Sequence, residues 1–287
     1  MHVPVMLPEA LEYLAPRADG TYIDETLGLG GHSGAIASRL ESGRLLSLDR
    51  DAESMELARQ NLAGQDISRV EFRQARFSEL RAAAASAGIS QADGLLADLG
   101  VSRYQLTTPE RGFSFMAAGE VDMRMDRSQG RTAGEIVNTV DERTLANLIF
   151  EYAEERRSRQ IARAIVRARP IRDTAHLAAV IESAVARQGP IHPATRTFMA
   201  LRLVVNEELE ELDSLLQTAP SLVRAGGRIV VITFMSLEDR KVKHSFQELA
   251  RQGRARILTK HVVRPSEQEV RENAPSRSAK LRAVEMT

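Results

Sequence analysis

A glycine-rich turn follows the first apolar segment of the chain, and its residues could hold a nucleotide-like cofactor. The turn runs from Asp24 through Gly28, Gly30 and Gly31 to His32. Glycine permits a positive φ and lets a ligand approach the bare backbone. The carboxylate of Asp24 beside the turn suits a cationic ligand. A purely structural turn between a strand and a helix is the alternative interpretation of the same glycines.

A second carboxylate, Asp49, closes the next apolar segment 21 residues after Gly28. An acidic side chain at that place can accept hydrogen bonds from both ribose hydroxyls of an adenosine cofactor. The glycines depart from the dinucleotide fingerprint, because its third glycine position falls on Ser33. This spacing disfavours NAD. It favours S-adenosylmethionine, which carries a cationic sulfonium and has no pyrophosphate to bind.

A third carboxylate, Asp98, ends a fourth apolar segment and is followed by Leu99-Gly100-Val101-Ser102. Ligands of parallel α/β sheets bind at the carboxyl ends of the strands, so we expect substrate to meet cofactor here. Transfer of a methyl group to an exocyclic amine needs an aligned nitrogen and an acceptor for the amine proton. Asp98 or a nearby carbonyl can be that acceptor. A carboxylate that merely caps the following turn is the alternative.

Short apolar segments that alternate with helix-period segments predict an α/β fold with a parallel sheet. The expected strands are Thr21–Asp24, Arg44–Asp49, Val70–Gln74, Gly94–Asp98 and Arg228–Phe234, and helices are expected to begin near Ser33, Ala52, Ser78 and Thr144. Two alternating segments in the tail, Arg256–Val263 and Ala279–Glu285, are expected to pair antiparallel at the sheet edge.

More than a hundred residues separate the fourth strand from the fifth, far more than one crossover needs. The pattern between them is helical, with helices expected at Glu142–Tyr152, Glu154–Arg169 and Thr174–Gln188, capped by Asp141 and Thr174, before a longer helix Ala194–Leu216. We therefore predict a Rossmann-like domain of residues 1–103 and 194–287 with an inserted all-helical domain of residues 104–193.

Composition narrows the classes of function. The 39 basic and 39 acidic residues cancel, so any nucleic-acid contact must be local. The chain has no cysteine, which excludes thiol catalysis and thiolate metal sites and suits a reducing cytoplasm. The six histidines lack HExxH-like spacing, so no metal is expected. No segment has the length and apolarity of a membrane span.

Several ordered motifs run through nearly the whole chain. They are His2-Val3-Pro4-Val5, Gly30-Gly31-His32-Ser33, Asp98-Leu99-Gly100-Val101-Ser102, Arg111-Gly112-Phe113-Ser114-Phe115, Asp122-Met123-Arg124-Met125-Asp126, His192-Pro193-Ala194-Thr195-Arg196-Thr197-Phe198, Ser236-Leu237-Glu238-Asp239-Arg240 and Ser276-Arg277-Ser278-Ala279-Lys280-Leu281-Arg282. Together they resemble the bacterial family of ribosomal RNA small-subunit methyltransferases H, also called MraW. Arg103, Thr107, Ala153 and Met235 depart from the family pattern.

The resemblance implies a class I methyltransferase that transfers a methyl group from S-adenosylmethionine to the exocyclic amine of a cytidine in 16S ribosomal RNA. It implies that the substrate is presented in a small-subunit particle, in the cytoplasm and away from membranes; a homodimer is left open. The implied cofactor residues are Gly30, Gly31, His32, Asp49, Phe77, Asp98 and Gln105. We assign catalysis to Asp98 and Ser102.

Contacts to RNA are expected from arginines of the helical insert and from a basic group in the tail. The helix expected from Glu154 carries an arginine stripe that could bind phosphates, although a solvated face with intrahelical pairs explains it equally well. The substrate candidates are Arg111, Phe115, Arg156, Arg157, Arg196, Arg277 and Lys280. Two other classes of function stay open: a non-catalytic RNA-binding or ribosome assembly factor, and an NAD-dependent oxidoreductase.

Overall fold

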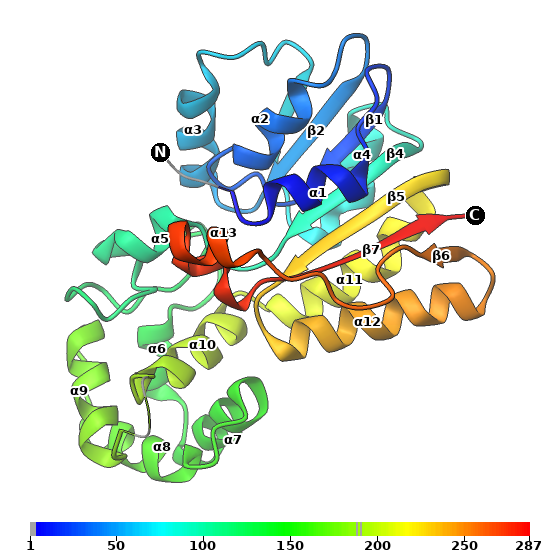
Figure 1. The fold of residues 1–287 in the computed structure, drawn as a ribbon. Helices are drawn as coiled ribbons and strands as arrows, with labels where there is room; N and C mark the ends of the chain where they lie inside the picture. The colour runs from blue at the N-terminus through cyan, green and yellow to red at the C-terminus, as the bar shows by residue number, and fades with distance from the viewer. Residues whose placement is uncertain (1–3, 188, 190) are drawn as a thin grey trace. The chain divides into compact units, whose positions relative to one another are not determined.

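The computed structural model describes residues 4–187, 189 and 191–287, and its chain divides into two compact units (Figure 1). The first unit comprises Met1–Val101 and Glu210–Thr287, and the second comprises Ser102–Leu209. The first unit holds β1 (Thr21–Asp24), β2 (Arg44–Asp49), β3 (Val70–Gln74), β4 (Ala92–Asp98), β5 (Val223–Thr233), β6 (Ala255–Ile257) and β7 (Lys280–Met286).

Within the described residues these strands form one seven-stranded sheet in the order β3-β2-β1-β4-β5-β7-β6. The pairs from β3 to β5 are parallel, and β7 runs antiparallel to β5 and β6. All five predicted parallel strands are therefore confirmed, although β5 begins at Val223 and not at Arg228. The antiparallel pair in the tail is also present, but its first strand ends at Ile257 and not at Val263. The chain winds from β1 to β3 in one direction and resumes at β4 on the other side of β1, so the ends of β1 and β4 form a topological switch point.

Helices cover both faces of the sheet because the strand residues alternate between two apolar cores. The first unit holds α1 (Leu7–Leu14), α2 (Gly31–Ala37), α3 (Ala52–Leu62), α4 (Leu80–Ser86), α11 (Glu208–Leu222), α12 (Ser236–Arg251) and α13 (Glu267–Glu272), with 3₁₀ turns η1 (Phe77–Glu79) and η3 (Ala274–Ser278). Residues of α1 and α2 pack on one face. Residues of α4, α11 and α12 pack on the other.

The second unit is helical, as the sequence predicts for this part of the chain. It holds α5 (Arg103–Thr107), η2 (Pro109–Arg111), α6 (Ala133–Thr139), α7 (Glu142–Ala153), α8 (Ser158–Arg167), α9 (Thr174–Ala184) and α10 (Ala194–Val205). Helix α7 packs against α8 and α10, and α8 packs against α9. The second unit extends to Leu209, past the predicted boundary at residue 193, because α10 packs on α7.

Several helix boundaries differ from the prediction. The single helix expected from Ala194 to Leu216 is two, because Glu207 has φ 52° and the side chain of Asn206 hydrogen-bonds to the backbone at Met123 and Met125. Helix α8 is shorter than expected at both ends. The cap of α9 is Asp173 and not Thr174, since Asp173 accepts from the amide of His176. Gln188, the expected end of that helix, lies outside the described residues.

Candidate functional site

The switch point brings the glycine-rich turn and two of the predicted carboxylates to one edge of the sheet. Asp24 ends β1 and Asp98 ends β4, and the backbone amide of Asp98 donates to Oγ1 of Thr26 at 2.6 Å. The amide of Glu25 donates to the carbonyl of Leu96 at 2.9 Å. These bonds extend the β1–β4 pairing beyond the strands and hold the turn against the end of β4.

The glycines of the turn are required by close contacts and by backbone conformation. Gly30 has φ 90°, a value that favours glycine, and a Cβ there would lie 2.9 Å from Cδ1 of Leu62. A Cβ on Gly31 would lie 2.3 Å from Cγ of Pro4. Gly28 also has a positive φ, 52°, but its Cβ would meet nothing closer than 3.8 Å. The turn therefore packs tightly on α3 and on the N-terminal segment while its backbone at Gly28 stays open to a ligand.

Asp24 is fully buried and holds the turn to α2 through hydrogen bonds. Its Oδ2 accepts from the hydroxyl of Ser33 at 2.6 Å, and its Oδ1 accepts from the amide of Thr26 at 3.1 Å. The hydroxyl of Ser33 also lies 2.7 Å from that of Ser47 on β2. Burial raises the pKa of Asp24 and these hydrogen bonds oppose the rise. Sequence reasoning named Asp24 but missed Ser33 and Ser47 as its supports.

Asp49 lies at the end of β2, beside the turn, in an arrangement that suits ribose binding. Its Oδ2 accepts from the amide of Gly28 at 2.7 Å, and its Oδ1 accepts from the amide of Asp51 at 2.9 Å. Each carboxylate oxygen has a second lone pair for a hydroxyl. Burial, the largest effect, raises the pKa of Asp49 to about 7, although both amides favour the carboxylate. The ribose role stays a prediction.

Asp98 and His32 face each other across the turn. Nδ1 of His32 lies 3.7 Å from Oδ2 of Asp98, and Nε2 of His32 lies 3.1 Å from the carbonyl of Val5. A carbonyl only accepts, so Nε2 carries the proton and donates to Val5. Among the described residues, Oδ1 of Asp98 has no hydrogen-bond partner. Burial, followed by the charges of Asp24, Glu238 and Glu269, raises the pKa of Asp98 well above its usual range.

Phe77 begins the short turn η1 directly after β3, beside the end of β2. The amide of Ala75, two residues earlier, donates to the carbonyl of Asp49 at 3.0 Å. The Phe77 ring is partly buried and packs against the core on the α4 face. Phe77 therefore follows β3, the strand that neighbours β2, which places it on the side of the site where the adenine of a cofactor bound at Asp49 is expected.

The residues at this edge fit the chemistry of S-adenosylmethionine. Asp98 offers an oxygen that is buried and has no partner, which costs free energy unless a cation or a donor reaches it. Asp49 offers two oriented oxygens to hydroxyls, and Gly28 offers bare backbone. Gly28, Asp49 and Asp98 are the residues of this edge whose geometry would suit the cofactor, and the cofactor roles of Gly30, Gly31, His32 and Phe77 stay predictions.

Ser102 and Gln105 belong to the second unit and are bound to each other. The hydroxyl of Ser102 accepts from the amide of Gln105 at 3.2 Å, and Oε1 of Gln105 accepts from the amide of Ser102 at 2.8 Å. This capping box starts α5. Gln105 is 3% exposed. The catalytic role of Ser102 and the cofactor role of Gln105 stay predictions.

Arg111 is buried inside the second unit, with 1% of its surface exposed. Its guanidinium donates to the carbonyls of Arg124 and Met125, each at 3.0 Å, and lies over the rings of Tyr104 and Phe113. These contacts hold the loop after η2. The sequence alone does not predict that Arg111 is buried, since arginine is seldom fully buried.

The remaining basic candidates differ in how much of their charge is free. Lys280 lies 3.8 Å from Asp239 and contacts Ser236, whereas Arg277 is exposed on η3. Arg196 is exposed and lies 3.5 Å from Glu155. Arg157 donates to the carbonyl of Ala186. Contact of these residues with substrate stays a prediction.

The arginines of the predicted stripe also differ in whether local groups contact their guanidinium groups. Arg163 pairs with Glu142 at 3.3 Å, and Arg169 donates to backbone carbonyls of Val137 and Val140. Arg156, Arg159 and Arg167 are exposed, and no acidic side chain of the described residues pairs with them. Arg159, Arg163 and Arg167 lie at helical spacing on one face of α8, opposite its buried residues.

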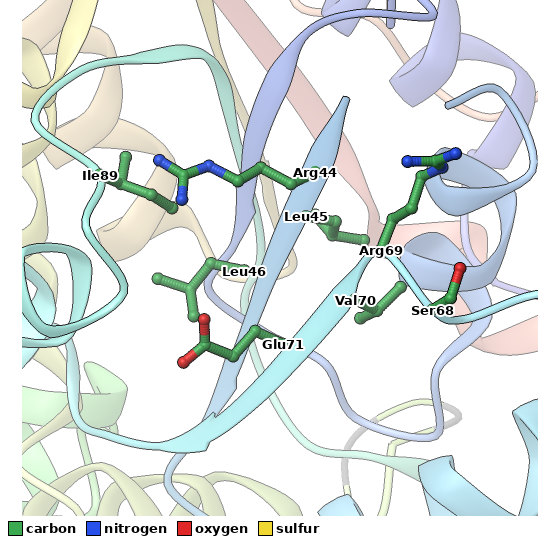
Figure 2. Close-up of a pocket in the computed structure, with 8 residues that line it drawn as sticks. All are labelled: Arg44, Leu45, Leu46, Ser68, Arg69, Val70, Glu71 and Ile89. Atoms are coloured by element: carbon green, nitrogen blue, oxygen red, sulfur yellow. The ribbon is translucent and has the colours of Figure 1, made fainter. Parts of the chain in front are cut away.

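A separate pocket lies at the opposite end of the sheet, at the amino ends of β2 and β3 (Figure 2). Arg44 and Arg69 line it, and Figure 2 shows that their guanidinium groups point away from each other. Arg44 donates to the carbonyls of Ala87 and Gly88. The pocket therefore offers no convergent anion site and takes no part in the cofactor edge.

No group of three or more histidine, aspartate or glutamate side chains among the described residues has the geometry to hold a metal ion. None of the helices described is both long enough and apolar enough to cross a membrane. His2 and Val3 of the first motif lie outside the described residues, whereas Pro4 packs on Gly31.

Glu25 is a buried carboxylate at the site that sequence reasoning missed. It is 3% exposed, and its Oε1 has no hydrogen-bond partner among the described residues. Burial, and then the charge of Asp24, raise its pKa well above the usual range. The folded chain therefore binds this proton more tightly than the unfolded chain, so stability is lost as the pH rises from the unfolded pKa toward the folded one.

We expect Glu25→Gln to raise the melting temperature at pH 8 by about 2–4 °C, roughly what 1 kcal/mol gives in a chain of this size. The gain should shrink at pH 5, where the parent keeps its proton. Thermal unfolding at both pH values checks this. Glu248→Gln is the control, because Arg251 lowers the pKa of Glu248 and no gain at pH 8 is expected. A gain that is equal at both pH values would contradict the explanation.

Comparison with known proteins agrees with this geometry. The model of the MraW methylase family matches residues 1–287. A ribosomal RNA small subunit methyltransferase H of Solibacter usitatus is 58% identical over 286 residues, which cover 100% of both chains. A protein of the same name from Acaryochloris marina is 45% identical, covering 99% of this chain and 94% of its own.

Among solved structures, a candidate rRNA methylase from Clostridium thermocellum is similar to this chain with a TM-score of 0.50. It is 11% identical in sequence, and the alignment covers 100% of both chains, so this likeness concerns the fold alone. It supports the predicted Rossmann-like fold. The full-length family match and the 58% identity decide the family. The chain belongs to the MraW methylase family.

Proposed function

We propose that the chain methylates the exocyclic amine of a cytidine in 16S ribosomal RNA, using S-adenosylmethionine, in the cytoplasm and within a small-subunit particle. Its relatives are named ribosomal RNA small subunit methyltransferases H. Membership of a methylase family removes the NAD-dependent alternative. The observation that carries the chemistry is Oδ1 of Asp98, a buried acceptor without a partner at the switch point of the sheet.

S-adenosylmethionine, when bound, supplies an electrophilic methyl group on a cationic sulfur. Oδ1 of Asp98 then accepts the proton that the amine loses, and the burial that raises the pKa of Asp98 makes it a stronger base than an exposed aspartate. The ring of His32, which the carbonyl of Val5 fixes in place, lies beside Oδ2 with Nδ1 at 3.7 Å. His32 thus packs beside Asp98 and limits where that carboxylate can move.

The residue inventory favours a nitrogen target over a ring carbon. Methylation of a pyrimidine carbon needs a covalent adduct to activate the ring, for which a thiolate is the usual nucleophile. The chain has no cysteine. Transfer to an exocyclic amine needs only alignment and a proton acceptor, which the turn and Asp98 supply.

The exposed arginines of the second unit are the part of the chain best suited to RNA phosphates. We expect the double substitution Arg159→Ala and Arg167→Ala to weaken binding of small-subunit RNA and to lower the salt slope of log K by ~0.7–0.9 per lost phosphate contact. Affinity for S-adenosylmethionine should not change. Titrations from 50 to 200 mM salt measure this, with Arg251→Ala as the control, because Arg251 is already paired with Glu248.

The function is tested by transfer of labelled methyl from S-adenosylmethionine to RNA from cells in which the gene is deleted. Deproteinised small-subunit RNA and intact small-subunit particles are compared. The proposal is supported if label enters the particles and is removed by ribonuclease. No label should enter RNA from parent cells, which carry the gene and whose target is already methylated. Cofactor binding without transfer to either substrate would favour the remaining alternative, a non-catalytic RNA-binding or assembly factor.

A further inference from the structure

Two of the sequence motifs meet in the second unit to form an aromatic cluster. The ring of Phe115 lies 4.6 Å from the imidazole of His192, centroid to centroid, with 35° between the planes. The same ring lies 4.9 Å from Phe198 in an edge arrangement, at 72°. Phe198 is 4% exposed and forms the buried base, whereas Phe115 and His192 are half-buried and reach the surface.

Local polar contacts fix the orientation of the His192 ring. Nδ1 accepts from the amide of Ala194 at 3.1 Å, so the neutral ring carries its proton on Nε2, which faces Glu182 at 3.7 Å. A backbone amide thus engages Nδ1, and Nε2 lies near an acidic side chain. The face of the imidazole is available for stacking. Because the His192 side chain is already held in one orientation, binding of a partner costs little side-chain entropy.

The surroundings combine exposed apolar surface with an arginine, and acidic side chains lie near both Arg196 and His192. Met116, next to Phe115, is 87% exposed, and Ile191, next to His192, is 57% exposed. Arg196 is exposed in the first turn of α10, which follows His192. Partly exposed rings beside an arginine are a surface on which proteins stack unpaired nucleobases, with the cation near the phosphates.

We propose that Phe115 and His192 form a stacking platform for an unpaired nucleobase of the substrate RNA. The inference rests on the proposed function, and it assigns His192 a role that no motif match gives it. The platform recognises the π-face of a base and is therefore tolerant of base identity. It contributes to binding of RNA and leaves binding of S-adenosylmethionine and the chemical step unchanged.

The test compares four variants in steady-state methylation of small-subunit RNA and in direct binding of a single-stranded oligocytidine. His192→Ala and Phe115→Ala are expected to raise KM for RNA and weaken oligocytidine binding roughly 10-fold or more, with the affinity for S-adenosylmethionine unchanged. His192→Phe, which keeps a ring, should restore most of the binding. Phe150→Ala is the matched control, because Phe150 is an exposed aromatic of α7, 56% exposed.

Each outcome decides between explanations. If both alanine variants keep the parental KM and the parental oligocytidine affinity, the stacking proposal is wrong. That result is expected if these rings bind an apolar peptide instead. Loss in His192→Ala without recovery in His192→Phe would assign the imidazole a hydrogen-bonding role and also overturn stacking. Phe115 packs on the buried Phe198, so Phe115→Ala can destabilise the fold. Thermal unfolding is therefore measured for every variant, and the conclusion rests on His192→Ala if Phe115→Ala is unfolded. Absence of methyl transfer by the parent enzyme would refute the proposed function, while oligocytidine binding still tests the platform.

Discussion

Asp98→Asn is expected to lower kcat for methyl transfer by ~10²–10⁴-fold, the range that a positioned proton acceptor contributes. The carboxylate is isosteric with the amide, but the amide cannot accept a proton at neutral pH. The fold should be preserved, because the side chain of Asp98 makes no hydrogen bond at Oδ1 and its backbone amide still donates to Thr26. The measurement is single-turnover methylation with labelled S-adenosylmethionine.

Thermal unfolding of the same variant separates function from stability. Burial and three neighbouring carboxylates raise the pKa of Asp98, so the folded state is penalised when that group ionises. Removing the charge should leave the melting temperature at pH 8 equal to or above that of the parent enzyme. Parental turnover in Asp98→Asn would remove Asp98 from the catalytic role. A collapse of the melting temperature would show that it is structural.

Asp49→Ala is expected to weaken binding of S-adenosylmethionine by about 1–3 kcal/mol, or ~5- to 150-fold in Kd, if two hydrogen bonds to the ribose are lost. Calorimetry measures this affinity. Asp66→Ala is the control, because Asp66 is an exposed acid of the same unit. A Kd within twofold of the parental value would place the ribose elsewhere.

The parental affinity should also depend on pH in a stated direction. Burial raises the pKa of Asp49 to about 7, and only the carboxylate accepts from both hydroxyls. Because the free protein holds a proton that the complex must release, affinity should increase as the pH rises from 6 to 8. Asp49→Ala should flatten this dependence. An affinity of the parent enzyme that falls with rising pH would contradict the assignment.

The sheet and the cofactor edge were predictable because they depend on local signals. Short apolar segments that end in Asp24, Asp49 and Asp98 specify both the strands and the residues placed at their carboxyl ends. Helix α6 was missed, although Thr132 and Glu135 form a capping box that the sequence displays. The break at Glu207 carried no local signal, since it depends on Asn206 binding a loop distant in sequence.

The side-chain roles that sequence reasoning could not supply depend on long-range packing. Glu25 resembles any acid in a turn until the structure shows it 3% exposed. Phe115 and His192 belong to separate motifs, and only folding of the second unit brings their rings together. Arg163 and Arg157 belong to the same stripe as Arg159, but local partners occupy their guanidinium groups.

We propose that the enzyme methylates the exocyclic nitrogen of a cytidine. The most direct test is nucleoside analysis of small-subunit RNA from gene-deleted cells after incubation with the enzyme and labelled S-adenosylmethionine, with Asp98→Asn in parallel. We expect label in cytidine methylated on its exocyclic amine with the parent enzyme and almost none with Asp98→Asn. Label on a ring carbon, on another nucleoside or at equal levels with both proteins would contradict it.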